Sequence, residues 1–289
     1  MSVSRRVSKL MGFWPLKPEQ GPRQRLGPKH LSELAWWEEG LRRRVAWYRG
    51  ERTMYGQPPP ADEEKQIRAT VEASAGVTTV AVSLNRYPEA LKIPRDHFAG
   101  KTILDLGCGP YPLSIAFEDC HIIGLDPLVH EYERAGFPLS EFADRVTFVR
   151  GFAEDMPFSS QSFDAVISVN AIDHVDDFPS AAREISRVLK TSGVLRMQVH
   201  YHAPKKLEPN ALDDDEILEH LGHLGIKKVS EEMPSIAARG PDSIPTVAPE
   251  ERFVVWANDA AGPTGSRPAF DQTSRSGLTG IRDTSPGLL

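Results

Sequence analysis

Cysteine is scarce in this chain, and so are the patterns that would commit it to metal or disulfide chemistry. Only Cys108 and Cys120 occur in 289 residues, with no further thiol or histidine at metal-ligand spacing. This excludes a disulfide scaffold and a zinc finger, and it indicates a reducing, cytoplasmic location. Long apolar runs are also missing, and the N-terminal segment lacks the apolar core of a secretion signal. We therefore expect no membrane association.

An excess of positive charge is absent as well. The formal net charge is −6, whereas phosphate binding needs a basic face, so nucleic acid is not an expected partner. The charge is uneven, because the first fifty residues are clearly basic, with LRRRVAWYR at 41–49 as the densest cluster. With 40% hydrophobic residues, the composition is that of a soluble globular core with an appendage.

Composition and periodicity divide the chain. Residues 31–50 are expected to form a helix, because apolar side chains recur there at helical spacing: Leu34, Trp37, Leu41, Val45 and Tyr48. Pro-rich residues 55–61 indicate a linker, and a second helical stretch starts near Asp62. The expected divisions are a basic flexible arm at 1–30, a helical N-terminal extension or lid at 31–98, a domain at 99–259 and a disordered tail at 260–289.

From Lys101 onward, short β-branched apolar runs alternate with helical segments. This alternation is typical of an α/β fold with a parallel sheet covered on both faces, a doubly wound arrangement. The clearest helix is expected at 177–193, capped by Asp177 and ended by Gly193, and another at 213–225. No helix-length segment separates the last two runs, which are expected to pair antiparallel at the sheet edge. The strands are predicted at 101–107, 121–126, 145–151, 163–170, 193–200, 226–233 and 252–258.

A glycine-rich turn follows the first predicted strand. In ILDLGCGP, at 103–110, Gly107 and Gly109 let a ligand approach the backbone closely. The dinucleotide fingerprint asks for a third glycine, where this chain has Pro112. Asp105 lies within the strand before the turn, and a buried carboxylate repels phosphate. The turn therefore suits a ligand with a cationic amino group better than it suits a pyrophosphate.

Two further strand ends carry residues that could bind a ligand. The second strand ends in Asp126, about twenty residues beyond the turn, where a carboxylate can accept hydrogen bonds from both ribose hydroxyls. A polar turn, GFAEDMPFSS, follows the third strand at 151–160. Carboxyl ends of parallel strands meet at one edge of a sheet, which is where ligands of open α/β sheets bind.

At these residues the chain resembles a known family, the class I S-adenosylmethionine-dependent methyltransferases of the type 11 kind. The segments ILDLGCGP, GLDP, AEDMPF, SFDAVISVNAIDHV and EISRVLKTSG resemble its successive motifs, in order and at the right spacing, over roughly residues 100–200. The resemblance implies a Rossmann-like sheet of seven strands, mostly parallel with an antiparallel last strand. It also implies that the domain at 99–259 binds S-adenosyl-L-methionine and releases S-adenosyl-L-homocysteine.

The resemblance also assigns the expected cofactor contacts. Asp105 and the two glycines would line the methionine end, Asp126 would hold the ribose, and Ala153 and Glu154 would lie beside the adenine. Two departures stand out, because Phe152 replaces an acid that many members use for the adenine amino group, and Tyr111 replaces a third glycine. Cys108 is interpreted as a small residue that fits the tight turn. The expected set is Asp105, Gly107, Cys108, Gly109, Asp126, Pro127, Phe152, Ala153, Glu154 and Asn170.

Candidates for contact with the methyl acceptor follow strands four and five. His174 is interpreted as a general base, with Asp173 as its orienting group, because a histidine steered by a carboxylate titrates near neutral pH. The alternative is that His174 bonds the backbone or caps the next helix. Strand alternation places His200 and His202 on one face, either toward the acceptor or with one at the surface.

No metal site is expected. A divalent ion held by Asp173, His174 and Asp176 or Asp177 is conceivable, but acids before a helix are usually caps. The aromatic, basic segment with Trp36, Trp37 and the arginines at 42–44 could cover a carbohydrate acceptor, or it could simply pack on the sheet.

The motifs NAIDHV and LDPL resemble a subset of methyltransferases that act on polysaccharides and glycosylated metabolites, which favours O-methylation of a sugar or other small molecule. Three alternatives stay open. They are N- or C-methylation of a metabolite, a non-catalytic cofactor-binding regulator or scaffold, and a nucleic-acid methyltransferase. The acidic net charge and the sequence NAID at the end of strand four disfavour the last.

Overall fold

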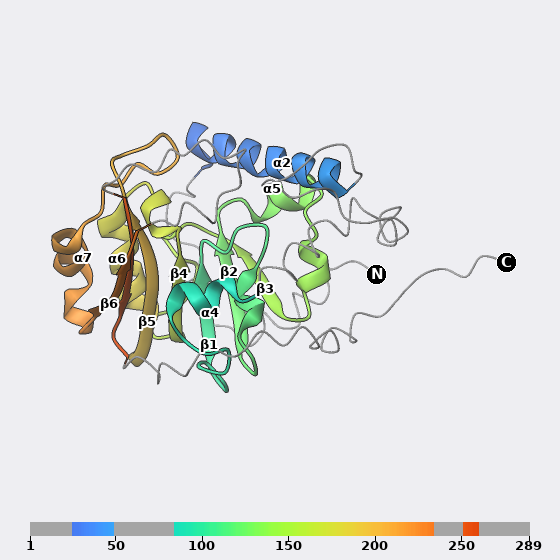
Figure 1. Ribbon diagram of the computed structural model, residues 1–289. Helices are drawn as coiled ribbons and strands as arrows, with labels where there is room; N and C mark the ends of the chain where they lie inside the picture. The colour runs from blue at the N-terminus through green and yellow to red at the C-terminus, as the bar shows by residue number, and fades with distance from the viewer. Residues whose placement is uncertain (1–24, 49–83, 234–250, 260–289) are drawn as a thin grey trace.

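The computed structural model describes residues 25–48, 84–233 and 251–259. They form one sheet with helices on both faces and a long helix across one edge (Figure 1). The strands are β1 (Thr102–Leu106), β2 (His121–Asp126), β3 (Val146–Arg150), β4 (Phe163–Val169), β5 (Leu189–Tyr201), β6 (Lys227–Glu232) and β7 (Arg252–Ala257). The helices are α2 (Pro28–Tyr48), α4 (Arg86–Leu91), η3 (Leu113–Ala116), α5 (Val129–Arg134), η4 (Leu139–Phe142), η5 (Ile172–His174), α6 (Phe178–Val188), α7 (Asp214–Leu221) and η6 (Gly222–Leu224).

Several expectations lie outside the described residues. These are the arm before residue 25, the linker at 55–61, the helical stretch from Asp62, the tail from 260 and the side chains of Trp47 and Tyr48. The proposed domain divisions therefore stay predictions.

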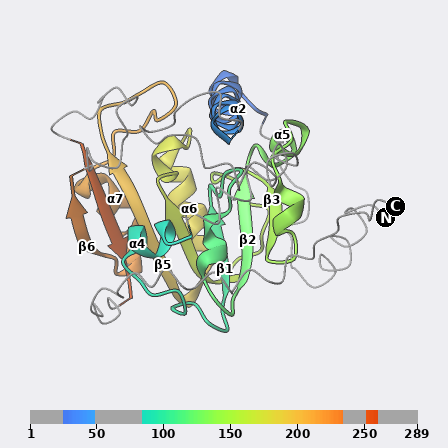
Figure 2. The ribbon, with the colours of Figure 1, turned by 45° about the vertical axis from the view of Figure 1, so that its right-hand side comes forward.

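The seven strands run in the order β3-β2-β1-β4-β5-β7-β6 (Figure 2). The first five strands in this order run parallel to one another, and β7 inserts antiparallel between β5 and β6. This confirms the doubly wound, Rossmann-like, mostly parallel sheet with an antiparallel last strand. The direction in which the chain adds strands reverses at β1, because β2 and β3 lie on one side of β1 and β4 and the later strands lie on its other side. The carboxyl ends of β1, β2 and β4 therefore form the crevice in which such sheets bind ligands.

Alternation along each strand sends its apolar side chains to two cores. Ile103 packs with Phe98, Phe117 and Ile167 on one face of the sheet, toward α4, η3 and α5. Leu104 packs on the other face, toward α6 and α7, in a core that includes Ile185 and Ile217. Burial on both faces explains why these strands read as nearly continuous apolar runs.

Helix α6 begins as expected and ends earlier than expected. Asp177 caps it by accepting a hydrogen bond from the Ser180 backbone N–H at 3.2 Å. The expectation that Gly193 ends the helix was wrong, because α6 stops at Val188 and β5 starts at Leu189. Backbone pairing of Leu189 with Phe163 of β4 ends the helix, and Gly193 lies inside the strand. A Cβ on Gly193 would lie 2.6 Å from the Leu189 side chain, so glycine fits this bulged start of β5.

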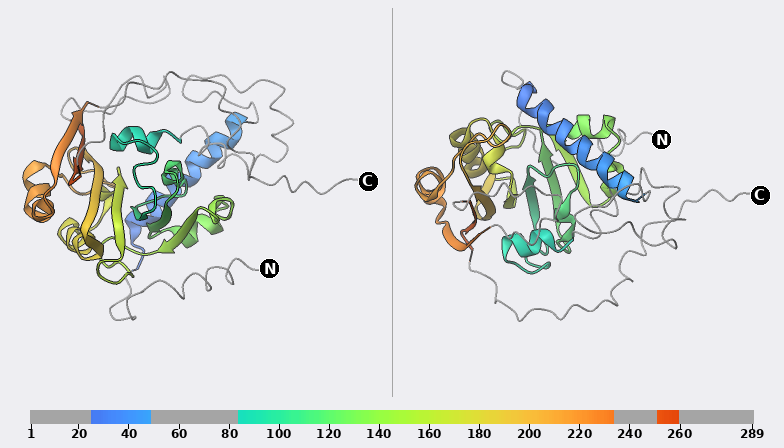
Figure 3. Two further views of the ribbon diagram at one scale, coloured as in Figure 1. Left: turned by 90° about the horizontal axis from the view of Figure 1, so that it is seen from below. Right: turned by 45° about the horizontal axis from the view of Figure 1, so that its top comes forward.

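Helix α2 confirms the helix expected at 31–50, although it begins at Pro28. Leu34, Trp37 and Leu41 of its apolar stripe pack against the core on the α4 side of the sheet. The helix runs across the carboxyl ends of the strands (Figure 3, right). Lys29 ties its start to the loop after β4, through an ion pair with Asp176 at 2.5 Å and a hydrogen bond to the His174 carbonyl. Among the described helices, none has a stretch apolar and long enough to cross a bilayer.

Candidate active site

The glycine turn at the end of β1 depends on backbone that only glycine adopts easily. Gly107 and Gly109 have φ of +73° and +61°, in the left-handed region that disfavours side chains. A Cβ on Gly107 would also lie 2.4 Å from the Cβ of Ala171, which follows β4. The indole ring of Trp37 in α2 packs on Gly109. A Cβ at this glycine would lie 3.5 Å from the ring. The turn is therefore held between the β4 loop and α2.

Asp105 lies in β1 just before this turn and is fully buried. Neither of its carboxylate oxygens makes a hydrogen bond. Burial raises its pKa to about 7, the nearby Ser114 hydroxyl opposes the rise, and the charge of Asp126 adds to it. A buried carboxyl group with both oxygens unpartnered is a position that a cationic or hydrogen-donating ligand group would stabilise.

Asp126 ends β2 and binds the turn directly. Its carboxylate accepts hydrogen bonds from the backbone N–H groups of Gly109 at 3.0 Å and Leu128 at 2.8 Å. Burial raises its pKa to about 6, and these two hydrogen bonds oppose the rise. Glu33 of α2 is a neighbour that the sequence analysis missed. Burial, and then the charge of Asp126, raise its pKa to about 7. Three carboxyl groups, on β1, β2 and α2, thus crowd one end of the crevice.

Cys108 and Pro127 contribute to packing and to a turn. The Cys108 sulfur fills the space beside Gly124, where a Cβ would lie 2.8 Å from it. Burial raises the pKa of this thiol well above its ordinary value, so it is a packing group and a poor nucleophile. Pro127 lies between Asp126 and Leu128 at the turn into α5.

The residues after β3 lie at the other end of the crevice. The Phe152 ring is buried and meets the ring of His30 from α2 edge to face, with centroids 5.4 Å apart. Ala153 packs against the core on the α6 side. The Glu154 carboxylate accepts hydrogen bonds from the backbone N–H groups of Asp176 at 2.7 Å and Asp177 at 3.3 Å. Glu154 therefore supports the start of α6, and Phe152 presents the apolar surface.

Asn170 ends β4 in an uncommon conformation. Its φ is +52°, and its backbone N–H donates to the Gln198 carbonyl of β5 at 3.0 Å. Left-handed backbone at a residue other than glycine is concentrated at functional sites. The turn at Asn170 sends the chain to Asp173 and His174 in η5.

The structure brings together the four residues expected on the acceptor side, but it pairs them differently. The Asp173 carboxylate lies 3.2 Å from Nε2 of His202 and 3.9 Å from Nε2 of His174. Its hydrogen-bond partner is therefore His202. The rings of His200 and His202 lie side by side, with centroids 4.6 Å apart. His174 makes no side-chain hydrogen bond and lies 3.8 Å from Glu33.

Two carboxylates of this cluster were missed by the sequence analysis. Glu208 comes from the loop after β5 and lies 3.3 Å from Nε2 of His202. Glu251 precedes β7 and lies 3.2 Å from Nε2 of His200. The predicted antiparallel last strand was a usable signal for Glu251, because the start of such a strand lies beside the end of its neighbour.

Asp176 and Asp177 interact with groups outside this cluster. Asp176 pairs with Lys29, and Asp177 caps α6. The cation site considered at Asp173, His174 and one of these two acids is therefore not assembled.

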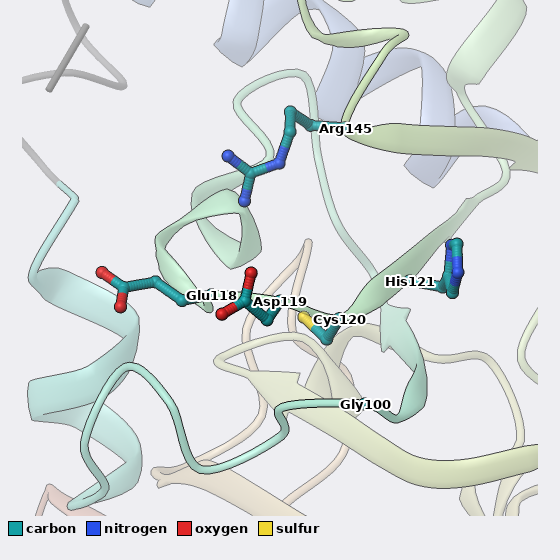
Figure 4. A pocket seen from close by; sticks show the side chains of 6 residues that line it. All are labelled: Gly100, Glu118, Asp119, Cys120, His121 and Arg145. Carbon is teal, nitrogen blue, oxygen red and sulfur yellow. The ribbon is translucent and has the colours of Figure 1, made fainter.

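A separate pocket lies at the opposite edge of the sheet, where β2 begins (Figure 4). Its lining includes His121, Cys120 and Arg145. The Arg145 guanidinium donates to the carbonyls of Ile115 and Phe117, each at 3.2 Å. This pocket shares no residue with the crevice described above.

Comparison with known proteins adds the family. Residues 104–197 match the model of a methyltransferase domain family. The sterol 24-C-methyltransferase erg6 of Aspergillus fumigatus is 36% identical over 104 residues, covering 33% of this chain and 26% of the relative. The O-methyltransferase rstn1 of Aspergillus nomiae is 30% identical over 117 residues, covering 39% and 52%.

An uncharacterized methyltransferase of Bacillus subtilis, YcgJ, is 35% identical over 127 residues, covering 42% of this chain and 47% of the relative. The crystal structure of the YcgJ protein superimposes with a TM-score of 0.46 at 18% identity, over 61% of this chain and 97% of that one. The chain thus spans between a quarter and about half of the length of these curated relatives. Residues 104–197, which include the glycine turn, Asp126 and Asp173, therefore match a methyltransferase domain.

Proposed function

We propose that the whole chain transfers the methyl group of S-adenosylmethionine to an oxygen of a small-molecule acceptor, with carbohydrates among the candidates. The observation that supports it most directly is Asp105, a fully buried carboxyl group without a hydrogen-bond partner beside a glycine turn. The amino group of the cofactor is a cation that would satisfy this carboxylate. The methyl group comes from the sulfonium of the cofactor, which is the electrophile of the reaction.

The surrounding residues fit the rest of that ligand. The Asp126 carboxylate accepts one hydrogen bond from each of two backbone N–H groups. It has further lone pairs that could accept hydrogen bonds from the ribose hydroxyls. Phe152, with His30 behind it, offers an apolar wall for a purine ring. The absence of side chains at Gly107 and Gly109 leaves the backbone open to close approach. Helix α2 covers this crevice and would exclude water from it.

On the acceptor side, His174 is the proposed general base. Both of its ring nitrogens lack a hydrogen-bond partner, and its side chain is 23% exposed. Its Nε2 lies 3.8 Å from Glu208 and 3.9 Å from Asp173, so nearby carboxylates would stabilise the imidazolium that forms when it takes the hydroxyl proton. Asp173, His200 and His202 would bind and orient the acceptor. A neutral hydroxyl needs such help, because it is a poor nucleophile.

The names of the relatives do not decide which acceptor atom is methylated. Two of the matched relatives are named for carbon and for oxygen methylation, so the family by itself does not choose the atom. The histidine and carboxylate cluster after β4 and β5 is what favours oxygen. A non-catalytic cofactor-binding protein is the competing function.

Calorimetric titration with S-adenosylhomocysteine, followed by methyl transfer to a panel of sugars, phenols and amines, tests the function. We expect micromolar binding and turnover on a hydroxyl acceptor. The His174→Ala variant should keep its affinity for S-adenosylhomocysteine and lose turnover by on the order of a hundredfold or more. His121→Ala, an exposed histidine at the opposite sheet edge, is the control. Full turnover of His174→Ala would remove the base assignment, and binding without turnover on any acceptor would favour the non-catalytic function.

Cofactor binding should depend on pH through Asp105. Its pKa of about 7 in the ligand-free protein means that lowering the pH protonates the group that must be ionised to bind a cation. Affinity for S-adenosylhomocysteine should fall roughly tenfold from pH 8 to pH 6, at 1.4 kcal/mol per tenfold. Calorimetry in matched buffers measures it, and Asp105→Asn should flatten the profile while weakening binding. An equally steep profile in Asp105→Asn would assign the effect to another carboxyl group, such as Glu33 or Asp126, whose pKa values burial also raises.

A further inference from the structure

Four metal-ligating side chains converge where β4 and β5 end. Asp173 comes from η5, His200 and His202 from the end of β5, and Glu208 from the loop that follows. One ligand atom from each lies within 4.8 Å of all the others. This set differs from the cation ligands considered in the sequence analysis, and the two histidines make it more than an acidic cluster.

The surroundings of His202 require a proton or a metal ion at its Nε2. Its Nδ1 lies 2.6 Å from the Ala203 carbonyl, so Nδ1 carries a hydrogen and donates. In the neutral ring, Nε2 then has a lone pair. That lone pair faces Asp173 Oδ2 at 3.2 Å and Glu208 Oε2 at 3.3 Å. Three acceptor atoms facing one another repel unless a proton or a metal ion lies among them.

One ring nitrogen of His200 also has a fixed partner, and the other nitrogen faces the cluster. Its Nε2 lies 3.2 Å from the Glu251 carboxylate, and Phe253 stacks on the ring with centroids 4.6 Å apart. These contacts orient the ring so that Nδ1 faces Glu208 Oε2 at 3.9 Å. Histidine ligands of metals commonly donate their other ring N–H to a carboxylate or a carbonyl. Both histidines here have such a partner.

Burial and charge also favour a divalent ion. The Asp173 side chain is fully buried, and its Oδ1 has no hydrogen-bond partner. Within the described part of the chain, the three carboxylates Asp173, Glu208 and Glu251 face one lysine, because Lys205 pairs with Glu251 at 2.9 Å and with Glu208 at 3.4 Å. With neutral imidazoles this leaves an excess of two negative charges. Lys205 is 40% exposed and reaches the carboxylates from the solvent side.

We propose that Asp173, His200, His202 and Glu208 bind one divalent first-row transition metal ion, such as Zn²⁺ or Mn²⁺, through Oδ2, Nδ1, Nε2 and Oε2. Two imidazoles with two carboxylates suit these ions better than Mg²⁺, which prefers oxygen ligands alone. Glu251 is a positioning residue that acts through His200. If the proposed O-methylation holds, the ion would also bind the acceptor oxygen, but metal binding itself does not rest on that function.

Calorimetric titration of the chelator-treated full chain with Zn²⁺, Mn²⁺ and Mg²⁺ tests the proposal without cofactor or acceptor. We expect one ion per chain at micromolar affinity for Zn²⁺ or Mn²⁺ and much weaker binding of Mg²⁺. His202→Ala and Asp173→Asn should each weaken binding by on the order of a hundredfold, and Glu251→Gln by about tenfold or more. The control is His220→Ala, which alters a second, more exposed cluster of Glu216, Glu219 and His220 on α7.

The outcomes distinguish a metal ion in this cluster from a proton on His202. Unchanged affinity in His202→Ala, or loss of affinity in His220→Ala instead, would overturn the assignment. Absence of stoichiometric binding in the wild type would mean that a proton on His202 holds the cluster together. If the variants do not fold, as judged by circular dichroism, the visible spectrum of the Co²⁺-loaded wild type decides, because histidine ligation changes it. Failure of methyl transfer with intact metal binding would count against the proposed function alone.

Discussion

Replacing Asp126 by alanine should weaken S-adenosylhomocysteine binding by on the order of a hundredfold or more. The carboxylate has two roles, because it accepts hydrogen bonds from Gly109 and Leu128 and has lone pairs left for the ribose. Hydrogen bonds to charged groups contribute about 1.5–3 kcal/mol each. The substitution removes those to the ligand and leaves two backbone N–H groups of the turn unpaired. Calorimetric titration measures the loss.

Two comparisons make the Asp126 result interpretable. Asp144→Ala removes an exposed acid near the start of β3 and should leave affinity unchanged. Asp126→Asn keeps the shape and one acceptor oxygen, so its affinity should lie between those of the wild type and Asp126→Ala. Thermal unfolding checks that each variant remains folded. Affinity of Asp126→Ala within a factor of three of the wild type would place the ribose elsewhere in the crevice.

The second large effect concerns stability. Arg196 in β5 is fully buried, and its guanidinium donates to the Leu91 carbonyl at 2.5 Å and to the Asp259 carboxylate at 2.7 Å. Asp259 also bonds His97 at 2.6 Å. Arg196 therefore ties β5 to the end of α4 and to the residues that follow β7. Arg196→Met keeps a long apolar side chain but leaves the Leu91 carbonyl and the Asp259 carboxylate without this partner. Breaking a buried pair in this way lowers the free energy of unfolding by about 3–5 kcal/mol.

Urea denaturation measures this loss, and an exposed ion pair supplies the control. Arg43 pairs with Glu39 on α2, with side chains 56% and 46% exposed. Arg43→Met should change the free energy of unfolding by less than about 1 kcal/mol, because such pairs contribute little. Equal effects of the two substitutions would show that the Arg196 network does not stabilise the fold as described.

Much of this protein could be predicted because the signals are contiguous in the chain. The strands of apolar residues, the turn at Gly107, the acid at the end of β2 and the cap at Asp177 each depend on neighbours within a few positions. Parallel strands then bring their carboxyl ends to one edge whatever their order. The end of α6 was predicted less well, since pairing between Leu189 and Phe163 decides it. That contact joins segments far apart in the sequence.

The sequence alone therefore determined the fold class, the glycine turn and which strand ends carry polar groups. Only the tertiary structure decided the partners of those groups. Asp173 bonds His202 and not its neighbour His174, because the turn at Asn170 and the end of β5 aim these side chains. Glu33 and Glu251 reach the crevice because α2 crosses the strand ends and β7 inserts beside β5. Such contacts depend on how separate segments pack, and local sequence patterns do not encode that packing.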